Sequence, residues 1–179
     1  MVVEELTDRA CLAILSRAHL ARLACALNDQ PYIVPVHVDF HDSYLYSFST
    51  LGRKIEWMRQ NPLVCLEIDE LSTAHEWTTV VVSGRYEELP DSSEYEYERS
   101  VAQRLFQRHP VWWQPASVPL AGHQPRTLVL FRILITQITG RRGGPDRTEA
   151  PIFLDDMPEA AGPRPRGLAH LLRRVLGRH

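Results

Sequence analysis

The sequence has few cysteines, no long apolar run and no excess of either charge. Its three cysteines, Cys11, Cys25 and Cys65, are odd in number and lack CxxC spacing, which favours reduced thiols over a disulfide framework. No stretch of about 18 consecutive apolar residues occurs, and the first residues lack the basic start of an export signal. We therefore expect a cytoplasmic protein that spans no membrane.

The charge balance gives no sign of a nucleic-acid partner. The formal net charge is -2, whereas nucleic-acid-binding domains usually carry a strong basic excess. A metal site is not expected either. His37 and His41 lie four residues apart in an extended segment, so their α-carbons are separated by up to roughly 13 Å, too far to share one ion.

Alternating apolar residues and turn signals predict a mainly β protein. We expect strands at residues 22–27, 31–40, 44–49, 63–69, 77–89 and 126–140. Helices are expected over residues 7–18, after residue 52 and over residues 91–108. Gly84, inside an expected strand, is a candidate for a bulge or a close backbone approach. The fold class is therefore α+β, mainly β, with a split β-barrel of about six antiparallel strands and flanking helices.

Composition changes near residue 140. Residues 1–140 contain all the expected strands, whereas residues 141–166 are rich in glycine, proline and charge, as linkers are. Residues 167–179 have the spacing of a basic amphipathic helix. We therefore expect one barrel domain, a linker and a short terminal helix.

The segment YSFSTLGRKIEWMRQNP, residues 46–62, runs from a strand into a helix. Ser49, Thr50, Arg53 and Lys54 gather hydroxyls and positive charges where the helix N–H groups are unpaired, which is a chemistry suited to a phosphate. The alternative is that a hydroxyl merely caps the helix and that the cations are solvated. A stripe of Leu51, Ile55 and Met58 is expected to face the core.

A proline interrupts the strand IVPVHV. Because proline has no N–H to donate, Pro35 belongs at a sheet edge or at a bulge, where neighbouring backbone groups stay available to a ligand. A plain edge strand explains the residue equally well. Together with the segment at residues 46–62, the strand could hold the two ends of a nucleotide-like cofactor.

These pieces in order, RLACAL, PYIVPVHVDF, STLGRK with its later NP, and VVVSGR, resemble the pyridoxamine 5'-phosphate oxidase-like split-barrel family. The similarity spans residues 16–140 and is to the flavin-nucleotide-binding branch that includes nitroimidazole-resistance-type proteins. The resemblance implies a homodimer that binds FMN between its subunits.

The resemblance also implies site residues. The flavin phosphate would meet Ser49, Thr50, Arg53 and Lys54, and the backbone of Val34, Pro35, Val36 and His37 would lie along the ring. Trp77 and Trp113 would close the site from the same or the partner subunit. No catalytic residue is identified.

The implied function is a flavin-dependent oxidoreductase acting on a small molecule. Three alternatives remain open: a deazaflavin-dependent reductase, a flavin-binding protein without turnover, and a haem protein with His37 or His75 as ligand. For these histidines a hydrogen-bonded structural role is the simpler interpretation.

Overall fold

A computed structural model describes residues 1–73, 76–108 and 127–145, all within the compact unit Met1–Asp146. Trp113, His75, the terminal helix and most of the expected linker lie outside the described residues.

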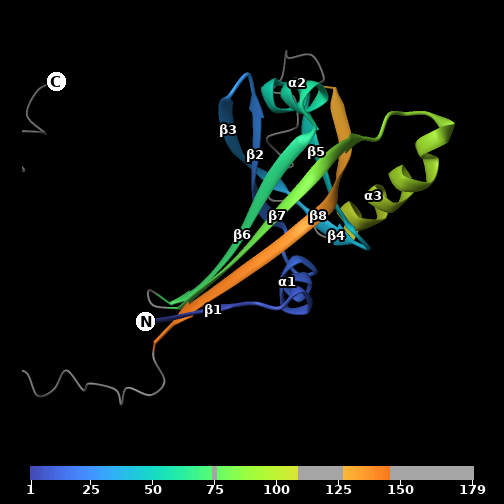
Figure 1. Cartoon of the computed structure of the whole chain (residues 1–179). Coiled ribbons are helices and arrows are strands. Elements are labelled where there is room, and N and C mark those ends of the chain that lie inside the picture. Colours follow the sequence, from blue (N-terminus) through green and yellow to red (C-terminus); the bar gives the residue numbers. More distant parts are fainter. Residues whose placement is uncertain (74–75, 109–126, 146–179) are drawn as a thin grey trace, which may run out of the picture. The chain divides into compact units, whose positions relative to one another are not determined.

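The described chain forms eight strands and three α-helices (Figure 1). The helices are α1 (Asp8–Leu15), α2 (Arg53–Gln60) and α3 (Glu96–Arg108), the last preceded by a single 3-10 turn, η1 (Ser93–Tyr95). The strands are β1 (Val2–Glu5), β2 (Leu20–Leu27), β3 (Gln30–His37), β4 (Asp39–His41), β5 (Tyr44–Thr50), β6 (Leu63–Thr73), β7 (Glu76–Glu88) and β8 (Leu128–Gly144).

All eight strands belong to one antiparallel sheet, in the order β3-β2-β6-β7-β8-β5-β4, with β1 paired to β8. The described sheet is not closed, which confirms the split barrel, but it has two strands more than expected. One extra strand is β1, and the other arises because the segment 31–40 breaks at Val38. There the Val38 N–H donates to the His19 carbonyl, and the chain leaves β2 to pair with β5.

One face of the sheet forms the main core. Along β2, the buried residues Ala21, Leu23 and Cys25 alternate with more exposed neighbours, as the period of a strand requires. Their neighbours in this core include Leu66, Val82, Phe131 and Ile133. α1 and α2 cover this face with Cys11, Ile14, Leu15, Ile55 and Met58.

α3 packs on a second, smaller cluster, made by Tyr46, Leu89, Val101, Ala102 and Leu105. The helical spacing of Val101 and Leu105 predicted their burial, whereas Tyr97 is exposed. Arg132 anchors this region from β8, with its guanidinium 4.1 Å from the ring centroid of Tyr44 and a bond of 2.8 Å to Glu87. α3 therefore covers the side of β5 and β8 that faces away from the main core.

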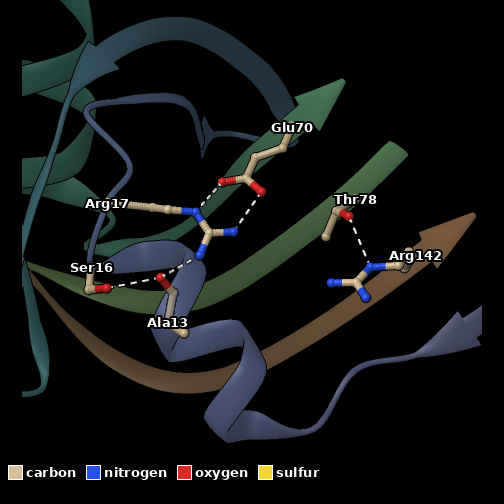
Figure 2. A network of polar contacts seen from close by, with 6 residues as sticks. All are labelled: Ala13, Ser16, Arg17, Glu70, Thr78 and Arg142. Carbon is tan, nitrogen blue, oxygen red and sulfur yellow. Dashed lines mark hydrogen bonds and ion pairs between the residues drawn. The ribbon is translucent and has the colours of Figure 1, made fainter. Parts of the chain in front are cut away.

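An ion pair fastens the end of α1 to β6 (Figure 2). Arg17 donates from Nε and Nη2 to the two carboxylate oxygens of Glu70, at 2.7 Å each, and from Nη1 to the Ala13 carbonyl at 3.1 Å. The Arg17 guanidinium holds the pKa of Glu70 below its ordinary value. Because both side chains are substantially exposed, the pair adds little to stability.

β8 runs to Gly144, so residues 141–144 belong to the sheet and not to a linker. The reason is pairing on both sides: Arg141–Gly144 pair with β1, and Arg141–Gly143 also pair with β7. A composition rich in glycine and arginine concealed this extension.

Gly84 lies at an irregularity in the β7–β8 pairing, as its position in the sequence predicted. A Cβ atom at this residue would lie 2.5 Å from Ile133 Cγ2 and 2.7 Å from the Leu134 carbonyl oxygen. The two strands therefore approach more closely here than a side chain allows.

Replacing Gly84 with alanine should lower the free energy of unfolding by about 1–3 kcal/mol, because the added methyl group overpacks the β7–β8 contact. Urea denaturation followed by circular dichroism measures this change. Gly52→Ala is the matched control, since no atom lies within 4 Å of the Cβ position there. Equal stability of the two variants would contradict the close approach.

Candidate functional site

The start of α2 is not capped by a hydroxyl. Its N-cap residue is Gly52, and no side chain makes a capping hydrogen bond to it. The Ser49 hydroxyl instead donates to the Thr50 carbonyl at 2.9 Å, and Ser49 is buried. The simple-cap interpretation of Ser49 and Thr50 is therefore wrong. Within the described residues, the first-turn N–H groups of α2 keep their capacity to bind an anion.

Arg53 is exposed in the first turn of α2. Its guanidinium carbon lies 5.4 Å from the ring centroid of Tyr32 on β3, and Tyr32 meets Trp57 of α2 edge to face at 5.7 Å. These contacts bring the helix start and strand β3 together. A cation–π contact leaves the guanidinium N–H groups able to bind an anion at the same time.

Lys54, the next residue, is half-buried and is the only lysine in the sequence. Burial lowers the pKa of Lys54, and the nearby thiol of Cys25 opposes this shift. The pKa of Cys25 is raised by its own burial. An ammonium group partly removed from water gains more from an anionic partner than a solvated one does.

Leu51 does not belong to the buried stripe of this helix. It precedes α2 and is 48% exposed, whereas Ile55 and Met58 are completely buried. The helix starts at Arg53, so only Ile55 and Met58 share its inward face. Two apolar side chains, rather than three, therefore fix α2 on the core.

The residues Val34, Pro35, Val36 and His37 form the end of β3, which is the edge strand of the described sheet. Val34 and Val36 point toward the core and Pro35 is exposed, so the edge position inferred from this proline is confirmed. The Ser47 hydroxyl of β5 donates to the His37 carbonyl at 2.6 Å and thereby joins the two sides of the split. The split thus lies between β3 and β5, beside the start of α2.

A partly buried cluster of His19, His37 and Asp39 was not anticipated from the sequence. One carboxylate oxygen of Asp39 lies 2.6 Å from His37 Nε2, and the other lies 3.1 Å from His19 Nδ1. Both His37 and Asp39 are almost fully buried. The His-x-Asp spacing where β3 ends was the signal that could have indicated it.

Aromatic rings surround the same histidine. Phe48 and Phe106 lie 5.7 and 5.5 Å from the His37 ring, measured between centroids, and they meet each other at 4.9 Å. His37 is thus hydrogen-bonded to Asp39 through Nε2 and packed among aromatic rings, as the structural interpretation predicts.

Trp77 is not brought together with these residues. Arg53 contacts Tyr32, which stands in register with Cys25, Val64 and Gly84 across the sheet. Trp77 lies seven positions from Gly84 along β7, a separation of about 23 Å at the usual rise of a strand. Figure 1 shows α2 at one end of the long strands β6–β8 and α1 and β1 at the other.

The described residues contain neither a membrane-spanning helix nor a metal-binding cluster. No helix among them is long and apolar enough to cross a membrane. In the same part of the chain, no three or more His, Cys, Asp and Glu side chains are grouped so as to hold a metal ion.

Comparison with known proteins agrees with this geometry. An uncharacterised protein of Rhizobium meliloti is 39% identical over 144 residues, which cover 79% of this chain and 95% of the relative. The solved structure of an FAD-binding protein from Mesorhizobium loti is 40% identical, with a TM-score of 0.68 over 81% of this chain and 99% of that one.

A more distant structure has the same fold. A putative 5-nitroimidazole antibiotic resistance protein from Bacteroides thetaiotaomicron is 18% identical, with a TM-score of 0.57 over 79% of this chain and 89% of that one. The family profile described as pyridoxamine 5'-phosphate oxidase matches residues 7–142, most of the chain. The chain therefore belongs to the pyridoxamine 5'-phosphate oxidase family.

Proposed function

We propose that this chain binds a flavin nucleotide, FMN in the first instance, and acts as a flavin-dependent oxidoreductase on a small molecule. The observation that carries the proposal is the uncapped start of α2, flanked by exposed Arg53 and half-buried Lys54 and placed beside the edge strand β3. The family of the chain and the 40% identity to a protein described as FAD-binding support it.

Different residues would bind the phosphate and the ring of the flavin nucleotide. Arg53, Lys54, the Thr50 hydroxyl and the first-turn N–H groups of α2 would hold the phosphate, since they combine positive charge with hydrogen-bond donors. Ser49 shapes the end of β5, because its hydroxyl already bonds the Thr50 carbonyl. The backbone of Val34–His37 would lie along the ring, which supplies the redox chemistry when bound. Within one chain Trp77 lies too far from α2 to reach this site, so it would close the site from the partner subunit.

The subunit arrangement is part of the proposal. Leu20, Ile33 and Leu63 are apolar yet 46%, 59% and 63% exposed, and they lie on the neighbouring strands β2, β3 and β6. Ile33 and Leu63 stand near each other across β2, whereas Arg22 and Glu67 separate Leu20 from them on the same face. We assign this outer face of the sheet to a homodimer, since exposed apolar side chains favour a surface that another chain covers, and light scattering should report twice the chain mass.

The decisive experiment is the absorbance spectrum of the purified protein, followed by titrations with FMN, FAD and riboflavin monitored by quenching of flavin fluorescence. Binding of FMN well above riboflavin is the expected result. Preference for FAD over FMN would select the dinucleotide form suggested by the Mesorhizobium loti protein. A colourless protein that binds none of the three would refute the proposal. Reduction of the bound flavin by NADH or NADPH then separates an enzyme from a flavin carrier.

Because Lys54 is the only lysine, its pKa can be followed directly. Reductive methylation with ¹³C-formaldehyde labels this one side chain, apart from the amino terminus, for NMR titration. In the flavin-free protein the pKa should lie below the ordinary lysine value, because burial disfavours the charged form. Saturating FMN should raise it, since a phosphate dianion stabilises the ammonium group, whereas riboflavin should not. Identical shifts with both ligands would remove Lys54 from the phosphate site.

The burial of Lys54 also predicts how stability changes when this residue is replaced. A lowered folded pKa means that the unfolded chain binds more protons, so stability rises with pH between the folded and the unfolded pKa of Lys54. Lys54→Met should therefore unfold at an equal or higher temperature than the wild type at neutral pH, while binding FMN more weakly. Differential scanning calorimetry measures the melting temperature, and flavin titration measures the FMN affinity. A lower melting temperature for Lys54→Met would contradict the expected effect of burial.

A further inference from the structure

A buried carboxylate lies where strand β3 gives way to strand β4. Asp39 is the first residue of β4 and is only 4% exposed. Its two oxygens lie 2.6 Å from His37 Nε2 and 3.1 Å from His19 Nδ1. Because a carboxylate only accepts hydrogen bonds, both imidazoles act as donors to it. The carboxylate therefore joins the end of β3 to the residue that precedes β2.

Backbone contacts hold the same break in the edge strand. The Val38 N–H donates to the His19 carbonyl at 3.3 Å, and the Ser47 hydroxyl donates to the His37 carbonyl at 2.6 Å. His37 is thus held by its carbonyl from β5 and by its ring from Asp39. The place of the last residue of β3 depends on these contacts together.

Stability is a poor reason for a carboxylate at this position. A buried carboxylate loses its hydration, and a buried charged pair often stabilises a fold no better than packed apolar side chains do. Such a pair specifies geometry instead, because its hydrogen bonds are short and directional. Phe48 and Phe106 lie 5.7 and 5.5 Å from the His37 ring, and apolar surroundings strengthen a hydrogen bond. The His19–Asp39–His37 cluster therefore gives the His37 ring one defined position.

We infer that Asp39 is a positioning residue for the flavin ring, because it fixes, through His37, the backbone of residues 34–37 along which the ring would lie. The inference rests on the proposed flavin function and adds to it a residue that touches neither the ring nor the phosphate. Since His37 is the last of these four residues, a displacement of its imidazole is passed to the end of the strand. Loss of Asp39 should act on the ring end of the site and leave the phosphate end at α2 unchanged.

The first test is Asp39→Ala, titrated with FMN and riboflavin by quenching of flavin fluorescence. Both ligands should bind about tenfold more weakly, because a strand end that is no longer fixed must be ordered when the ring binds. An equal loss for both ligands separates the ring end of the site from the phosphate end, which only FMN uses. The visible absorption band of FMN bound to the variant should also move toward that of free FMN. Lower stability alone would not move this band.

His19 provides a second test that leaves the buried carboxylate in place, since the His19 side chain is 39% exposed. His19→Ala removes one of the two donors to Asp39 and should weaken both flavins about threefold. His19→Asn keeps an amide donor near the position of Nδ1 and should restore the wild-type affinity. Asp42→Asn is the control, because it removes a 79% exposed carboxylate that lies 3.4 Å from His41. This change should leave both flavins unaffected.

A folded Asp39→Ala variant that binds both flavins as the wild type does would overturn the inference, and so would a loss confined to FMN. If Asp39→Ala does not fold, the His19 variants decide, because equal affinities of His19→Ala and His19→Asn would also overturn it. A wild type that binds neither flavin refutes the proposed function and the inference with it. Flavin binding by the wild type with unchanged variants refutes the inference alone.

Discussion

Replacing both Arg53 and Lys54 with alanine is expected to weaken FMN binding at least about tenfold while leaving riboflavin binding nearly unchanged. Each charge-assisted contact to a phosphate contributes about 1.5–3 kcal/mol, and the helix N–H groups compensate for part of the loss. Riboflavin lacks the phosphate and so does not use these contacts. Fluorescence titration of the wild type and the double variant with both ligands measures the difference.

The control for this experiment must remove the same charge elsewhere. Arg9 and Arg104 are exposed on α1 and α3, far along the chain from the start of α2, and Arg104 donates to the Ser100 hydroxyl on its own helix. Arg9→Ala with Arg104→Ala should therefore leave FMN affinity unchanged. If this pair weakens FMN as much as the Arg53/Lys54 pair does, the effect is one of overall charge. Normal FMN binding by a folded Arg53/Lys54 variant would place the phosphate elsewhere.

Ile55→Ala is expected to lower the free energy of unfolding by about 2–5 kcal/mol, because it empties a completely buried position of the core. Ile55 and Met58 attach α2 to the sheet, so the same change should loosen the start of the helix. FMN affinity should then fall although no ligand contact has been removed. Urea denaturation and flavin titration give the two quantities.

Leu51→Ala provides the comparison within the same segment. Leu51 is half-exposed, so its truncation should change stability by no more than about 0.5 kcal/mol, as is usual for surface positions. Similar losses from Ile55→Ala and Leu51→Ala would mean that the two side chains are buried alike and that the structure is wrong at this point.

The sequence was informative where one local rule governs the structure. Alternation predicted the strands β2 and β7, because side-chain direction in a strand depends only on parity. Pro35 predicted an edge, and Gly84 predicted a close approach, because each residue type is suited to few other places in a sheet. The family resemblance added the order of these pieces.

Other features depend on contacts between distant segments. The strand β1 is short and exposed throughout, and its pairing with the extended end of β8 leaves no apolar pattern to recognise. The His19–Asp39–His37 cluster requires the break at Val38, which brings residues from β3, β4 and the segment before β2 to one place. Likewise, the distance of Trp77 from α2 follows from register, which local sequence does not specify.

The edge strand β3 carries two prolines, Pro31 and Pro35, and this has a consequence for behaviour in concentrated solution. An edge strand with free N–H and C=O groups is a template on which strands of other molecules can add, and this is a route to aggregation. Each proline removes one donor and disfavours such an addition. β4, at the other end of the sheet, is only three residues long and offers little length for pairing. The edge strands β3 and β4 are thus poor starting points for fibril growth, even though Ile33 on β3 is exposed.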